Sequence, residues 1–206
     1  MFHKKFAFTL AEVLIAMTIV GVVAAMTIPT LHYQRVKQEY SAKLKNFYSR
    51  IENSILDMEQ DKGSFRDMTK PVSGKGFEWY MNNLDPYMGH EYVNKTTSSV
   101  YYKDGSKLGT FYTGGCLDVD YDVNGDKGPN RSGYDRFRFL FCFEDANRNI
   151  WFGNKDIFWG TYGSGVQGAG ASRGTMIEKC RTTPCWCTRL LQNDQWEFKP
   201  DYPFKF

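Results

Sequence analysis

The apolar residues near the amino terminus follow two patterns, one after the other. From Val13 to Leu31 the chain has no charged residue, and an α-helix needs about 20 apolar residues to cross the hydrocarbon core of a bilayer. Beyond Leu31, apolar side chains recur at spacings of three or four, which predicts one apolar stripe on a continuing amphipathic helix. This stripe consists of Tyr33, Val36, Tyr40, Leu44, Phe47, Ile51, Ile55 and Met58.

Local signals predict the orientation, shape and end of this helix. Lys4 and Lys5 precede the apolar segment, and the positive-inside rule keeps such an end in the cytoplasm. Pro29 removes one intrahelical hydrogen bond, so we expect a kink there. Gly63 is the expected stop, because glycine is common just after a last helical turn. The sequence therefore predicts one span and a helical extension beyond the membrane.

A single acidic residue, Glu12, lies near the start of the apolar segment. A carboxylate in a spanning helix costs roughly 2.5–3.5 kcal/mol on insertion scales. Such residues are functional-site candidates by default, because a buried charge needs a partner. We therefore expect Glu12 to be paired with something other than lipid.

Two strands are expected in the middle of the chain. Residues 116–122 alternate acidic and apolar side chains, and residues 135–143 carry phenylalanine at every second position. Period two is typical of strands, and the phenylalanines should face the core. Asn124-Gly125, which follows the first strand, is a strong hairpin signal.

The remaining segments complete the predicted head. We expect a short helix at 77–84, a strand entering a turn at 101–106, two short strands at 149–152 and 156–159, and a Gly/Ser-rich loop at 160–174. The predicted fold class is α+β: a long N-terminal transmembrane and amphipathic helix packed on a small antiparallel β-sheet head.

The segment after the first strand partly matches a Ca²⁺-binding loop. Asp120, Asp122 and Asn124 occupy the first ligand positions of the template, with glycine at the tight turn. Arg131 stands where the closing acid belongs. The alternative is a polar hairpin with Asx-turns that binds no ion. The candidate Ca²⁺ ligands are Asp118, Asp120, Asp122, Asn124, Asp126 and Asp135.

All five cysteines lie in the second half of the chain, which favours disulfides and an oxidising compartment. An odd number leaves one thiol unpaired within the chain. One expected bridge joins Cys180 to Cys187; the alternative joins one of the tail cysteines to Cys116 or Cys142. Cys185 is the fifth candidate, and the connectivity stays open at this point.

The segment Lys4-Lys5-Phe6-Ala7-Phe8-Thr9-Leu10-Ala11-Glu12-Val13-Leu14 resembles the prepilin processing signal of type IV pilins and type II secretion pseudopilins. The resemblance implies cleavage between Ala7 and Phe8 by a membrane peptidase, which then methylates the new amino terminus. Glu12 would become the acid five residues into the mature chain, and Pro29 lies where many pilins have a kinking proline. Ala7 departs from the glycine that is usual in the family.

The resemblance also implies a division of the chain: a cytoplasmic leader at 1–7 that is removed, a long helix at 8–62 whose first half spans the membrane, and an extracytoplasmic head at 63–206. The protein would reside in the inner (cytoplasmic) membrane with a cytoplasmic amino terminus and then enter a periplasmic or extracellular filament. Its implied partners are other copies of itself, other pilins, prepilin peptidase, an inner-membrane assembly platform and, before assembly, membrane lipid.

The function predicted from these features is structural. The sequence offers no catalytic constellation or phosphate loop, so we expect no enzyme. A formal net charge of +3 with scattered basic residues argues against nucleic acid as the main partner. We expect a subunit of a type IV pilus-like filament or type II secretion pseudopilus, and the possible Ca²⁺ loop favours the pseudopilus. The alternative is a membrane-tethered extracytoplasmic binding module that does not polymerise.

Overall fold

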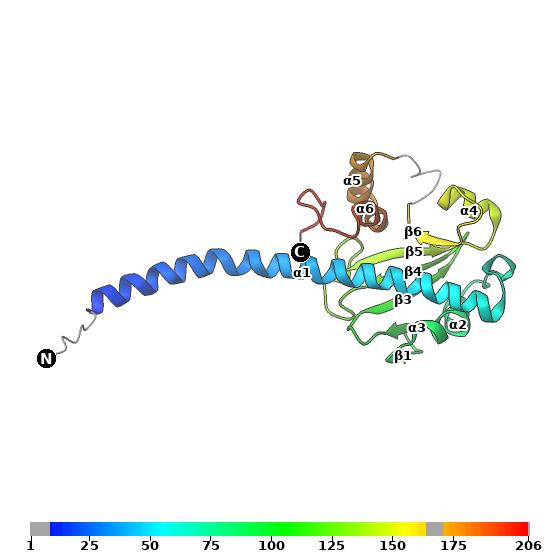
Figure 1. Ribbon diagram of the computed structural model, residues 1–206, viewed down its shortest axis with the longest axis horizontal. Coiled ribbons are helices and arrows are strands. Elements are labelled where there is room, and N and C mark those ends of the chain that lie inside the picture. The colour runs from blue at the N-terminus through cyan, green and yellow to red at the C-terminus, as the bar shows by residue number, and fades with distance from the viewer. Residues whose placement is uncertain (1–8, 164–170, 206) are drawn as a thin grey trace.

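The computed structural model describes residues 9–163 and 171–205. One long helix, α1, dominates it: its second half lies across a sheet, and its first half projects from the head as a free rod (Figure 1). This is the α+β, pilin-like layout that the sequence predicts. The helices are α1 (Leu10–Lys62), η1 (Phe65–Asp67), α2 (Gly76–Asn83), α3 (Asp85–Met88), α4 (Asp145–Phe152), α5 (Arg173–Thr182), η2 (Pro184–Trp186) and α6 (Cys187–Asn193). The strands are β1 (Tyr92–Asn94), β2 (Ser99–Tyr101), β3 (Lys107–Thr113), β4 (Leu117–Asp122), β5 (Arg136–Phe141) and β6 (Trp159–Thr161).

Helix α1 has 53 residues and is therefore about 80 Å long at 1.5 Å per residue. It continues through Pro29 without a break. It ends where predicted, at Gly63, whose φ of +87° suits a residue without a side chain and whose N–H donates to the Glu59 carbonyl.

The six strands form one sheet in the order β1-β2-β3-β4-β5-β6, and every neighbouring pair is antiparallel. Consecutive strands thus pair with each other as a meander. Helix α1 packs on one face, where the Phe47 ring stacks on Tyr121 with 3.9 Å between centroids and meets Phe139 edge-on at 5.2 Å. The apolar stripe predicted on α1 becomes the buried seam of the head, since all its members from Tyr40 to Met58 are buried.

A smaller apolar cluster lies on the opposite face of the sheet. Side chains alternate between faces along a strand, so Leu140 points away from the core that contains Phe139 and Phe141. Leu140 packs with Phe152 of α4 and with the cysteines of the disulfide between Cys116 and Cys142. Helix α4 therefore covers part of the face that α1 leaves open.

The predicted strand at 149–152 is wrong, because residues 145–152 form α4. The predicted strand at 156–159 is largely wrong, because β6 begins only at Trp159. The buried residues of α4 are Arg148 and Phe152, one helical turn apart, so burial follows period 3.6 rather than two. Gly153 closes the helix in the left-handed conformation, with φ of +68°.

The hairpin prediction is right in its pairing and wrong in its turn. β4 and β5 are antiparallel neighbours, but residues 123–135 connect them instead of a two-residue turn. Buried Asp135 holds this long loop, because its carboxylate accepts hydrogen bonds from the backbone N–H groups of Asn130 and Arg131, both at 2.7 Å. Gly125 adopts φ of +70° within the loop rather than at a hairpin tip.

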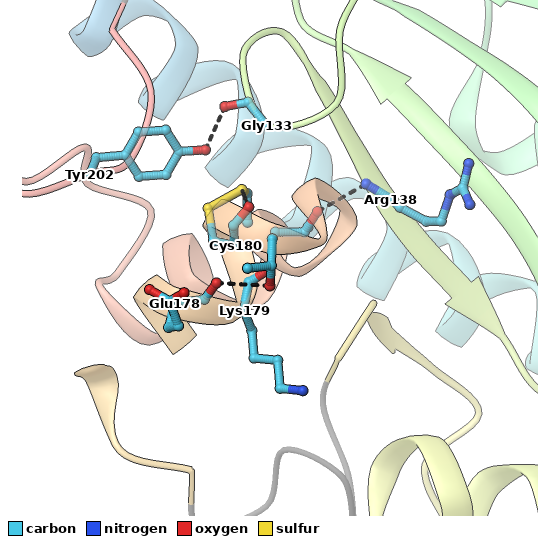
Figure 2. The surroundings of a disulfide bond; sticks show 9 residues. Gly133, Arg138, Glu178, Lys179, Cys180 and Tyr202 are labelled. Atoms are coloured by element: carbon cyan, nitrogen blue, oxygen red, sulfur yellow. Dashed lines mark hydrogen bonds between the residues drawn. A yellow bond between two sulfur atoms is a disulfide. The ribbon is translucent and has the colours of Figure 1, made fainter. Parts of the chain in front are cut away.

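The carboxyl-terminal segment fastens the layers together. The Ser41 hydroxyl on α1 donates to the Trp196 carbonyl at 2.5 Å, and the buried Tyr202 hydroxyl donates to the Gly133 carbonyl at 2.6 Å (Figure 2). The tail after α6 therefore connects the long helix with the β4–β5 loop.

Candidate functional site

The free half of α1 is an uncovered apolar surface. It belongs to α1, the one helix among the described residues that is long and apolar enough to cross a membrane, and none of the most apolar window of α1 is buried in the head. Exposed fractions reach 77% at Leu10, 67% at Val20 and 63% at Leu31. Contiguous apolar surface of this extent marks a membrane or protein contact rather than a solvated helix.

The polar side chains within this apolar stretch are bonded to their own helix. The Thr18 hydroxyl donates to the Leu14 carbonyl at 2.8 Å, and the Thr27 hydroxyl donates to the Val23 carbonyl at 3.0 Å. Such bonds leave no free hydroxyl facing hydrocarbon, where an unsatisfied polar group costs several kcal/mol. Glu12 is left as the one ionisable side chain of this apolar stretch.

Glu12 forms a capping box at the start of α1. Its Oε2 accepts hydrogen bonds from the Thr9 backbone N–H and the Thr9 hydroxyl, both at 2.8 Å. In return, the Glu12 N–H donates to the Thr9 hydroxyl oxygen at 3.3 Å. This arrangement satisfies N–H groups that the first turn leaves open, and the negative charge favours the helix N-terminus. This second role was not predicted from the sequence, although Thr9-x-x-Glu12 is the usual signature of such a box.

The predicted processing residues Ala7 and Phe8 lie outside the described residues. Thr9 is the first described residue and is the N-cap of α1. Glu12 is therefore held in the first turn, directly after the predicted cleavage point.

The first two of the predicted Ca²⁺ ligands share one arginine. Asp118 and Asp120 lie on the face of β4 that points away from α1, opposite Arg138 of β5. Arg138 donates two hydrogen bonds to Asp120, at 2.8 and 2.9 Å, and lies 3.7 Å from Asp118. Burial raises the pKa of Asp118 to about 6, although Arg138 opposes the shift.

The third carboxylate of this strand is paired in the same way. Arg136 donates from Nε to the buried Asp122 at 2.9 Å, and burial raises the pKa of Asp122 despite this bond. Arg136 and Arg138 thus form a ladder of opposite charge facing the acids of β4. The sequence signal for this ladder was the alternation of the two arginines with phenylalanines, which places them on the opposite face from the core.

The other predicted ligands point to different partners. Asp126 accepts from Lys107 at 2.6 Å and from the Tyr101 hydroxyl at 2.9 Å, and the hydrogen bond from Lys107 is the main reason that its pKa is lowered. The Asn124 amide donates to the Tyr40 hydroxyl at 2.9 Å, while Asp135 is occupied by backbone N–H groups. Within residues 9–163 and 171–205, no cluster of three or more His, Cys, Asp or Glu side chains could hold a metal ion. The observed arrangement therefore does not fit the predicted Ca²⁺ site.

Two disulfides form within the head. Cys180 is joined to Cys187, which is the first of the two expected pairings (Figure 2). Cys116, just before β4, is joined to Cys142, just after β5. Cys185 is the free, half-buried thiol. Neither bridge connects the tail with the sheet, so the alternative pairing is wrong.

Family models match the two parts of the chain separately. Residues 2–28 match a prokaryotic N-terminal methylation motif, which is the signal of type IV pilin and pseudopilin precursors. Residues 30–206 match a family of unknown function, DUF6613. The chain belongs to the DUF6613 family. No curated protein and no solved structure matches it.

The methylation motif and the DUF6613 region meet within α1. The motif covers the free half of the helix, and the DUF6613 region covers the rest of α1 and the whole head. The DUF6613 chain is thus a type IV pilin-like or pseudopilin-like precursor, a class that interacts with prepilin peptidase and other pilins. The apolar helix and this signal together indicate an inner-membrane anchor for an outward-facing head.

Proposed function

We propose that this DUF6613 protein is a structural subunit of a type IV pilus-like filament or a type II secretion pseudopilus. The observation that carries the proposal is the free half of α1. It exposes apolar side chains along its length, has one acid at its start and bears the processing signal. In the membrane, lipid covers this surface; in a filament, the same surface packs against other copies.

In this proposal, prepilin peptidase cuts between Ala7 and Phe8, and the new amine of Phe8 carries one methyl group. Glu12 then lies five residues into the mature chain. Pairing of its carboxylate with the Phe8 amine of a neighbouring copy would offset the cost of burying both charges. Because this pairing requires one axial offset between helices, Glu12 would set the register of assembly.

The capping box adds a condition to this mechanism. In the single subunit, Glu12 already accepts two hydrogen bonds from Thr9, so its carboxylate has hydrogen-bond donors before assembly. Each carboxylate oxygen has two acceptor sites, so Glu12 retains acceptor capacity for a cation from another chain. Glu12 therefore serves the helix before assembly and the contact during it.

Two substitutions separate these roles. Glu12→Gln keeps a side chain that can close the capping box but removes the charge, whereas Glu12→Val removes both. We expect both variants to insert into the membrane, to be cleaved and to form no filaments in the native host. The matched control is Glu52→Gln on the solvated part of α1, which should assemble normally. Normal filaments from Glu12→Gln would contradict the register role.

Intact-mass analysis of the membrane-extracted protein tests the processing step independently. We expect loss of residues 1–7 and addition of the mass of one methyl group. An intact amino terminus would instead support the alternative function, a membrane-tethered binding module that does not polymerise.

A further inference from the structure

A basic pocket lies beside α1 on the head, on the side of helix α3 and the turn between β2 and β3. Its volume is about 460 Å³, within the range of small-molecule sites. Three different segments contribute its basic side chains: Arg50 from α1, His90 from the turn after α3, and Lys103 from the β2–β3 turn. These residues lie outside the methylation motif and take no part in the proposed contact between Glu12 and Phe8.

The Arg50 guanidinium is fixed in one position. Its Nη2 donates to the Met88 carbonyl at 2.6 Å and to the Gly89 carbonyl at 3.3 Å. Its Cζ also lies 4.9 Å from the centre of the Tyr102 ring, in the range of a cation–π contact. These contacts use one of its three nitrogens, and among the described residues Nε and Nη1 have no hydrogen-bond partner. A guanidinium held in this way can bind an anion with little further loss of side-chain entropy.

His90 is oriented from beneath by a buried carboxylate. Asp85 is only 5% exposed, and its Oδ2 lies 2.7 Å from the His90 Nδ1. Since an ionised carboxylate only accepts hydrogen bonds, this contact places a proton on Nδ1. The other ring nitrogen, Nε2, has no hydrogen-bond partner among the described residues. The other oxygen of Asp85, Oδ1, is buried without a hydrogen-bond partner among the described residues, so the negative charge beneath the ring is only partly balanced within the head.

The third basic group is the Lys103 side chain, which is exposed. Within the described part of the chain, the Lys103 ammonium makes no hydrogen bond or ion pair. The neighbouring acid, Asp104, accepts hydrogen bonds from the backbone N–H and the hydroxyl of Ser106, at 3.0 and 2.5 Å. The acid on the rim is therefore occupied, while Arg50 and Lys103 keep donors that have no partner among the described residues.

We propose that this pocket binds a carboxylate-bearing ligand through the donors of Arg50 and Lys103, with the His90 ring forming one wall. More basic than acidic side chains line the pocket, so it favours an anion, and the planar guanidinium of Arg50 matches the geometry of a carboxylate group. A lipid headgroup is too far away, because Arg50 lies 19 residues beyond Leu31, roughly 28 Å along the helix. The carboxylate comes either from a free organic acid or from an acidic side chain on a second copy. The proposal does not depend on polymerisation.

Calorimetric titration with citrate, as a soluble multicarboxylate, tests the pocket. The full chain is kept in nonionic detergent micelles, so that no anionic headgroup competes. Lys103 is exposed and makes no hydrogen bond or ion pair with the other described residues, so Lys103→Glu should leave the fold intact. We expect it to weaken citrate binding about tenfold, somewhat more than removal of one exposed ion pair would. The matched control, Lys45→Glu, reverses a charge on α1 outside the pocket and should bind as the wild type does.

Sedimentation of the same samples distinguishes the two sources of the carboxylate. If a second copy supplies it, self-association is reversed by citrate and lost in Lys103→Glu. If a free acid is the ligand, citrate binds without changing the sedimentation. The proposal is overturned if citrate neither binds nor changes the sedimentation, or if Lys45→Glu weakens binding as much as Lys103→Glu does.

Discussion

The two halves of α1 both carry apolar side chains, but they differ in how these side chains are distributed and in what surrounds them. The half from Tyr40 to Met58 buries its apolar stripe against the sheet, where Leu44 and Met58 have no exposed surface. The half from Leu10 to Leu31 is apolar around its whole circumference, and the head covers none of its most apolar window. A helix that is apolar on one side is completed by its own domain, whereas one that is apolar all round requires lipid or other helices. The second half therefore determines the fold, and the first half supports the proposed assembly.

The largest expected effect comes from the covered half. Phe47→Ala removes the ring that stacks on Tyr121 and meets Phe139, and such a truncation in a core typically costs about 3–5 kcal/mol. We expect a much lower Tm of the head, measured by circular dichroism of the full chain in micelles. Val20→Ala in the free half is the control and should leave the Tm unchanged. An equal loss in both variants would remove the distinction between the halves.

The next effect concerns the free half. Val20→Lys places a charge in the predicted span at a cost of roughly 2.5–3.5 kcal/mol on insertion scales. We expect a smaller share of the protein in the membrane fraction, measured by flotation, with the Tm of the head unchanged. Lys45→Glu, a charge change on the covered half that faces solvent, should float as the wild type does. A lowered Tm of the head in Val20→Lys would contradict the independence of the two halves.

A smaller effect is expected from the tail that contacts the covered half. The Cys180–Cys187 bridge joins α5 to the first residue of α6 and closes a loop with a separation of seven residues. A chain-entropy estimate for such a loop gives about 2.4 kcal/mol. Replacing both cysteines with serine should therefore lower the Tm of the head, and Cys185→Ser, which removes the free thiol, should change it little. A double variant as stable as the wild type would show that this bridge does not support the tail.

The smallest effect tests the charged face of the sheet, away from α1. Burial raises the pKa of Asp118 to about 6 from its ordinary 3.8, so the folded state binds this proton more tightly than the unfolded state. The stability contributed by the proton is present below pH 4 and is lost as the pH rises to about 6.

Asp118→Asn should remove this dependence. Because Arg138 keeps its two bonds to Asp120, we expect the variant to be more stable than the wild type at pH 7, by on the order of 1 kcal/mol. Urea unfolding between pH 4 and 8 measures the difference. Asp126→Asn is the control: the pKa of that exposed carboxyl is lowered, so its replacement should not make the protein more stable at pH 7. A variant that is less stable at pH 7 would show that the pairing with Arg138 outweighs the burial of Asp118.

Local patterns predicted the long helix and the central strands well. The stripe up to Met58, the stop at Gly63 and the alternating phenylalanines of β5 each reflect a period that one element imposes on its own side chains. Prediction failed where a short aromatic segment had no such period. Residues 149–152 looked like a strand, yet Arg148 and Phe152 are buried one turn apart in α4.

The candidate site divides in the same way. The processing signal and Glu12 could be found from sequence, because a peptidase signal and a lone acid in an apolar run are local features. The Ca²⁺ prediction relied on acids spaced along one strand. Arg136 and Arg138 on the neighbouring strand bind those acids, and only the register of β4 with β5 brings them opposite.

The sequence by itself determined the anchor, its orientation signal and the place where the helix ends, because hydrophobic length, charge and glycine act within one segment. Tertiary structure decided which half of α1 is covered, which cysteines are joined and how the acids of β4 are neutralised. It also brought Arg50, His90 and Lys103 around one pocket. These outcomes depend on contacts between segments far apart in the chain, and such contacts leave no periodic signal in any one of them.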